Sequence, residues 1–157
     1  MHRTDTNTPL QAINGFLRGV GTHFLIDTDG TIYQCASLHK WTQHVGKIRS
    51  KAKETSTWNE KERQYIKSLG NDVQALHNYE KTKQYPNRYP INSDSIGIEV
   101  VGKHKNNQWE VVTQAQKDSI NTLIEILKQE YSLTNNDIYE HDKISRKTEG
   151  EGANLYP

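Results

Sequence analysis

The apolar run from Ile96 to Val101 constrains the fold more than any other segment of this 157-residue chain. It follows Ser95 and is interrupted by a single acid, Glu99. A short apolar run bounded by polar loops is typical of a strand in the middle of a sheet. An acid in such a strand either faces solvent or lies in a pocket, where partly apolar surroundings would raise its pKa. The pattern leaves both interpretations of Glu99 open.

The segments around this strand predict a mixed sheet with helices packed against it. The Asp-Gly ending of Asp27-Thr28-Asp29-Gly30 is a strong hairpin signal, and Thr113 and Gln116 have the spacing of a capping box. The fold class is therefore α/β (α+β), with a central mixed sheet of about five strands in a single domain, 1–157, and a helical insertion over 47–90. The predicted strands are Thr22–Ile26, Thr31–Cys35 and Ser95–Val101, and the predicted helices are Pro9–Arg18, Trp58–Leu69, Val73–Tyr79 and Thr113–Tyr131. The segment Gly102 to Gln108 is predicted to be the loop after the central strand.

Composition and charge exclude several classes of partner. Hydrophobic residues make up 32% of the chain, but they gather in runs, which predicts a compact domain rather than disorder. The net charge of +1 gives no reason to expect a nucleic-acid partner. No stretch approaches the roughly 20 apolar residues of a membrane span, and no signal peptide opens the chain, so no membrane partner is expected.

Two smaller features have a plain interpretation and a functional one. The basic run Lys47 to Lys53 is interpreted as a solvated helix face, with a binding patch as the alternative. Cys35 is the only cysteine, so no internal disulfide can form. We expect it to be a buried apolar residue of a strand rather than a nucleophile.

The chain end holds the groups best suited to bind a metal. His141 heads a segment without apolar periodicity, predicted to be loop-like, and Lys147, Glu149 and Glu151 follow it. Two distant histidines, here His2 and His141, with one nearby carboxylate are a common ligand set for catalytic zinc. Taken alone, His141 is better interpreted as an exposed loop histidine, and Lys147 is either a group that stabilises an oxyanion or an ordinary surface lysine.

Five motifs in order resemble a known enzyme family. The chain is similar, over nearly its whole length, to N-acetylmuramoyl-L-alanine amidases of the peptidoglycan-recognition-protein-like (amidase type 2) superfamily. A tyrosine- and proline-rich linker, 85–90, and the basic stretch before it resemble a branch carried by prophages and type VI secretion loci. The motifs are His2-Arg3-Thr4, the segment 21–34, the segment 44–50, Asn92 to Glu99, and His141 to Lys147.

The resemblance implies a zinc-dependent hydrolase that cuts the amide bond between N-acetylmuramic acid and L-alanine in peptidoglycan. It implies that His2 and His141 are zinc ligands and that Glu99 assists the attacking water. Lys147 matches the basic residue that steadies the oxyanion. His44, in a Trp-x-x-His-x-Gly motif, is expected to line the substrate groove.

The resemblance leaves the third zinc ligand open, because relatives carry an Asp ten residues or a Cys eight residues after the second histidine. Those spacings point to Glu151, which we favour, and to Glu149 as the alternative. Thr22 replaces a tyrosine of phage-type relatives, which assigns the assisting role to Glu99. The family's first strand should precede His2 and is expected to be missing here; if His2 frays, zinc affinity should drop.

The main alternative function is a peptidoglycan-binding module that keeps the groove but lacks the metal. A third interpretation is an interaction protein whose basic run, 47–53, binds an acidic partner. For the amidase we expect a peptidoglycan or muropeptide substrate, an immunity protein if it is a secreted antibacterial effector, and a monomer. We expect it in the cytoplasm, or exported by a non-classical route to act on the cell wall in the periplasm.

Overall fold

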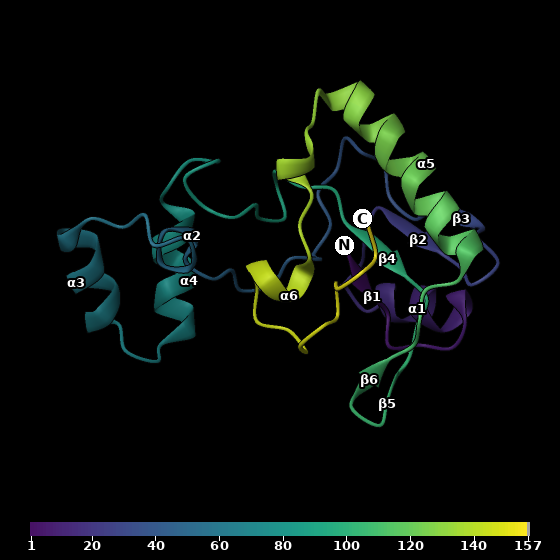
Figure 1. Cartoon of the computed structure of the whole chain (residues 1–157), viewed down its shortest axis with the longest axis horizontal. Helices are drawn as coiled ribbons and strands as arrows, with labels where there is room; N and C mark the ends of the chain where they lie inside the picture. Colours follow the sequence, from purple (N-terminus) through teal and green to yellow (C-terminus); the bar gives the residue numbers. More distant parts are fainter. Residues whose placement is uncertain (157) are drawn as a thin grey trace.

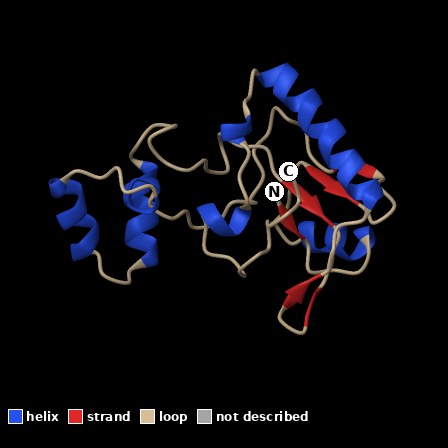
Figure 2. Cartoon of the chain, in the orientation of Figure 1, coloured by secondary structure: helices blue, strands red, loops and turns tan. Residues whose placement is uncertain are grey.

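A computed structural model describes residues 1–156 and shows a four-stranded mixed sheet. The sheet has the order β1-β4-β2-β3, with β4 parallel to both of its neighbours and β2 antiparallel to β3 (Figures 1 and 2). The strands are β1 (His2–Arg3), β2 (Phe24–Ile26), β3 (Ile32–Gln34) and β4 (Ile98–Val100). The predicted fold class is confirmed, and the apolar run around Glu99 does form an inner strand.

The two faces of β4 have different neighbours because side chains alternate along a strand. Ile98 and Val100 are buried in the main core with residues of α5 (Gln114–Tyr131). Glu99, between them, points to the opposite face, where Leu25 packs with Val101 and with α1 (Pro9–Phe16). The acid is therefore buried on one side of an otherwise apolar strand, rather than exposed at an edge.

The longest helix, α5, covers the main-core face of the sheet (Figure 1). It begins with the predicted capping box, in which Thr113 accepts a hydrogen bond from the Gln116 amide and the Gln116 side chain bonds back to Thr113. Its buried residues Ile120, Leu123 and Leu127 fill the core. Among residues 1–156, neither α5 nor any other helix is long and apolar enough to cross a membrane.

The first strand is short but firmly held. His2 and Arg3 pair in parallel with β4, in a register that sets His2 opposite Glu99. Arg3 Nη1 donates to the carbonyls of Gly150, Glu151 and Ala153, so the chain's last segment is bound to its first. The strand expected to be missing is formed by His2 and Arg3 themselves, and because both are buried, His2 does not fray.

Three helices lie apart from the sheet, at the left of Figure 1. They are α2 (Lys51–Glu54), α3 (Glu60–Ser68) and α4 (Val73–Lys81), and they belong to the segment predicted as an insertion. Lys83 joins α3 to α4 through ion pairs with Glu62 and the fully buried Glu80. The helices predicted over 58–69 and 73–79 are confirmed as α3 and α4.

Three local predictions are wrong. Cys35 is exposed because β3 lies at the sheet edge and all its residues face solvent. His141 begins a short helix, α6 (His141–Ile144), rather than lying in a loop, because its imidazole is drawn into a buried cluster. The predicted loop after β4 contains a hairpin, β5 (His104–Lys105) and β6 (Gln108–Trp109), which positive-φ Asn106 and Asn107 turn.

The packing of α5 predicts a large difference between two isoleucines on the same helix. Ile120 is 0% exposed and Ile126 is 57% exposed. Ile120→Ala should lower the free energy of unfolding by about 2–5 kcal/mol, because a buried cavity is left behind. Ile126→Ala should change it by less than about 0.5 kcal/mol. Urea denaturation of both variants measures this, and equal destabilisation would contradict the placement of α5.

Candidate metal centre

Residues from both ends of the chain and from the central strand meet on one face of the sheet. β1 supplies His2, β4 supplies Glu99, α6 supplies His141, and the final segment supplies Glu151. All four side chains belong to buried residues. The backbone fixes their approach, because the His141 amide donates to the Met1 carbonyl and the Arg3 amide donates to the Glu151 carbonyl.

The two histidines converge on a single carboxylate oxygen. Glu151 Oε1 lies 3.2 Å from His141 Nδ1 and 3.3 Å from His2 Nδ1. The imidazole rings of His2 and His141 meet edge to face, with centroids 4.4 Å apart. Glu99 Oε1 lies 3.4 Å from His2 Nε2 on the other side of that ring. These residues thus form one compact polar cluster inside an apolar domain.

The hydrogen bonds of His141 show which of its nitrogens is available to a metal. Its Nε2 lies 2.8 Å from the Val45 carbonyl, which can only accept a hydrogen bond, so Nε2 carries the proton. In the neutral ring Nδ1 then presents a lone pair, and it faces another acceptor, Glu151 Oε1. Two buried lone pairs that point at each other need a cation between them, which is either an added proton or a metal ion.

The distances suit zinc. Metal bonds of about 2.0–2.1 Å in a tetrahedron place neighbouring ligand atoms roughly 3.3 Å apart, as these nitrogens and oxygen are. One ligand atom each from His2, His141 and Glu151 lies within 4.8 Å of the others. Two imidazoles and one carboxylate are also a ligand set of catalytic zinc sites, which leave the fourth position to water. The residues present therefore fit a zinc ion.

Burial sets the protonation of the cluster. It lowers the pKa of His2 to about 3, which keeps this ring neutral as a metal ligand requires. Burial, with the nearby charge of Glu151, raises the pKa of Glu99 to about 8. Burial also opposes ionisation of Glu151, but hydrogen bonding to His141 and His2 outweighs it and holds the pKa of Glu151 at about 2. The two acids therefore differ in proton affinity although they share one site.

The remaining predicted site residues lie at the edges of the cluster. Lys147 is exposed and lines a cavity of about 250 Å³ together with His2, Glu99 and Glu151. Glu149 is exposed and lies outside the His–His–Glu cluster. Its backbone carbonyl accepts a hydrogen bond from Trp109 Nε1, which fixes the loop but not the carboxylate.

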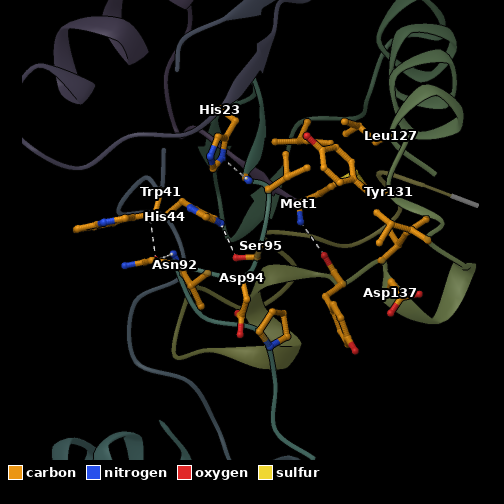
Figure 3. Close-up of a pocket in the computed structure, with 18 of the residues that line it drawn as sticks. Met1, His23, Trp41, His44, Asn92, Asp94, Ser95, Leu127, Tyr131 and Asp137 are labelled. Carbon is orange, nitrogen blue, oxygen red and sulfur yellow. Dashed lines mark hydrogen bonds between the residues drawn. The ribbon is translucent and has the colours of Figure 1, made fainter. Parts of the chain in front are cut away.

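His44 and the neighbouring His23 border a second, larger cavity of about 490 Å³ (Figure 3). His44 is buried and its Nε2 lies 3.0 Å from Ser95 Oγ. His23 Nε2 donates to the Lys40 carbonyl, and its Nδ1 accepts from the Gly97 amide. Both histidines are thus tied into the walls of the larger cavity, and His44 also lines the smaller cavity beside the cluster.

Two structural residues of the site escaped the sequence analysis. Asp142 is buried and its carboxylate accepts from the amides of Gly150 and Gly152, which holds the loop that carries Glu151. A Cβ on Gly152 would lie 2.6 Å from the His141 amide nitrogen, so only glycine allows this approach. The glycines on either side of Glu151 were the only sequence feature that could have indicated this close approach of the backbone.

The fold and the site together are typical of a metal-dependent hydrolase. The α+β domain has a buried His–His–Glu set of potential metal ligands and, beside it, an acid on the central strand. The chain belongs to the N-acetylmuramoyl-L-alanine amidase family, whose sequence model matches residues 1–152. This supports peptidoglycan amidase activity in general, with peptidoglycan as the substrate class. No curated protein that was compared matches the chain. The prophage and type VI branch, an immunity protein and the monomeric state stay predictions.

The geometry predicts that Glu151, and not Glu149, is required to hold zinc. Purified protein should contain about one zinc per chain, as a three-residue site of this kind does. Glu151→Gln should lose most of it, because a neutral amide is a poor zinc ligand, and His141→Ala should lose it too. Glu149→Gln is the matched control and should keep its zinc. Elemental analysis decides, and zinc loss in Glu149→Gln with retention in Glu151→Gln would reverse the assignment.

Proposed function

We propose that this protein hydrolyses the amide bond between N-acetylmuramic acid and L-alanine in peptidoglycan with the help of one zinc ion. The observation that carries the proposal is the convergence of His2 Nδ1 and His141 Nδ1 on Glu151 Oε1, at 3.3 and 3.2 Å. A buried arrangement of this kind is stable with a cation at its centre. Membership of the amidase family supplies the reaction class.

His2, His141 and Glu151 would hold the ion. A zinc ion bound there would polarise the amide carbonyl and lower the pKa of its water ligand toward neutrality. The protein's own part is to orient His141 by its bond to the Val45 carbonyl and to keep His2 neutral by burial.

Glu99 is the general base of the proposed reaction. Its carboxylate lines the 250 Å³ cavity together with His2 and Glu151, on the same face of the sheet as His2. Its raised pKa gives it the proton affinity that a base needs near neutral pH. Glu99 takes a proton from the attacking water as the new C–O bond forms. It then returns this proton to the alanine nitrogen as the C–N bond breaks, which leaves a lactyl carboxylate and a free amine.

Lys147 and His44 complete the proposed site. Lys147 lines the same cavity as Glu99, where its ammonium group can stabilise the negative oxygen that develops on the carbonyl. His44 lines both cavities and is held by Ser95 and Thr42, so it forms a fixed wall for the substrate. The metal-free binding module predicted as the alternative would keep these walls but would not cleave.

The role of Glu99 is tested by separating catalysis from metal binding. Glu99→Gln should keep its zinc but lower kcat on a muropeptide by roughly 10²–10⁴-fold, because the amide cannot accept the water proton. Glu130→Gln, an exposed change on α5, is the control and should leave kcat unaltered. Mass spectrometry measures release of the peptide that begins with L-alanine. Full activity in Glu99→Gln, or no cleavage by the wild type loaded with zinc, would contradict the proposal.

A further inference from the structure

The charges of the chain are divided unevenly between the segment 47–90 and the rest. This segment holds ten Lys and Arg against five Asp and Glu, whereas the remaining residues hold ten against fourteen. The segment that contains α2, α3 and α4 is therefore basic, whereas the rest of the protein is acidic, although the net charge of the whole chain is close to zero. These three helices lie apart from the sheet (Figure 1). An excess of one sign on one part of a surface attracts partners of the opposite sign.

Three exposed lysines follow one another from the candidate metal centre toward α4. Lys147 lines the cavity that contains Glu99, and its Cε lies 3.8 Å from the point where a Cβ on Gly46 would be. Lys47 follows Gly46 in the sequence, and the Lys47 carbonyl accepts a hydrogen bond from the amide of Arg146, which precedes Lys147. The loop that carries Lys147 and the loop that carries Lys47 therefore lie side by side.

The series of lysines continues from Lys47 to α4. The amide of Ile48 donates to His77 Nδ1, which ties the loop to this helix. Lys81 lies four residues after His77 and so occupies the same face of α4. The pKa of His77 is lowered by burial and by the charges of Lys81 and Lys47, in agreement with both lysines lying close to it. We call Lys147, Lys47 and Lys81 the lysine strip.

The lysine strip has no anionic partner within the described part of the chain. All three lysines are exposed, and none takes part in an ion pair among residues 1–156. Of the other lysines in this segment, Lys83 is paired with Glu62 and Glu80, whereas Lys51, Lys53, Lys61 and Lys67 have no ion pair among residues 1–156. A row of free like charges on one surface is favourable when an anionic ligand lies along it.

We propose that the lysine strip is a docking surface for the carboxylate-bearing stem peptides of polymeric peptidoglycan, which lie next to the bond being cut. The inference rests on the proposed function for the identity of the polymer. The strip begins at the reacting site and leads away from it, so it matches a substrate that extends beyond a single muropeptide. Lysines suit this role because they attract carboxylates as mobile point charges without demanding one geometry.

The test is sedimentation with purified peptidoglycan sacculi that have been stripped of other wall polymers. All proteins carry Glu99→Gln, so that the polymer stays intact. Lys47→Glu with Lys81→Glu should raise the apparent Kd by roughly tenfold at low salt, because exposed charges act through a field that salt screens. Lys61→Glu with Lys67→Glu on α3 changes the net charge equally and should leave Kd unaltered. Thermal melting and zinc content verify that each protein is folded.

Chemical capping of the sacculus carboxylates as neutral amides provides the second arm. Capped sacculi should bind the Lys47/Lys81 variant and its parent equally. Equal loss of binding in both double variants, no loss in either, or a difference that persists on capped sacculi would each overturn the proposal, the last pointing to another anionic partner. Binding is measured without cleavage, so a wild-type protein that fails to hydrolyse muropeptides would refute the proposed function and not the docking surface.

Discussion

The site depends on the parallel pairing of β1 with β4. This pairing has only two register partners, His2 with Glu99 and Arg3 with Val100. It places a ligand candidate and a base candidate side by side on one face of the sheet. Arg3, from the same strand, then binds three carbonyls of the segment that carries Glu151. One short strand therefore positions side chains that are as much as 149 residues apart in sequence.

The buried cluster is unfavourable on its own and favourable around a cation. Near neutral pH His2 is neutral and Glu151 is ionised, whereas burial raises the pKa of Glu99 to about 8, so that this acid is mostly protonated. The metal-free cluster therefore contains the carboxylate charge of Glu151 and several lone pairs that face one another. Removing such groups from water costs free energy that the neighbouring hydrogen bonds only partly offset. An ion that binds the folded protein and not the unfolded chain would stabilise the fold. The proposed metal binding would therefore be coupled to fold stability through the same residues.

Much of the fold could be predicted from the sequence, because hydrophobic period, hairpin signal and capping box all act locally. The exposed Cys35 could not, since a β-rich segment does not reveal that its strand lies at the edge of the sheet. Residue types indicated His2, His141 and Glu99 as candidate site residues. The choice between Glu151 and Glu149 depends on a loop that hydrogen bonds to Asp142 hold in place, and no periodic pattern in the sequence indicates these bonds. The lysine strip escaped prediction for the same reason, since it joins loops that are about 100 residues apart.

We propose that His2, His141 and Glu151 hold one zinc ion, and X-ray absorption at the zinc K edge tests this proposal most directly. The expected spectrum has a four-coordinate first shell of nitrogen and oxygen only, at about 2.0–2.1 Å, with the outer-shell scattering of two imidazole rings. A shell that contains sulfur, a shell of six oxygens, or scattering from a single imidazole would contradict it. Any of these results would place the metal at residues other than the cluster that β1 and β4 assemble.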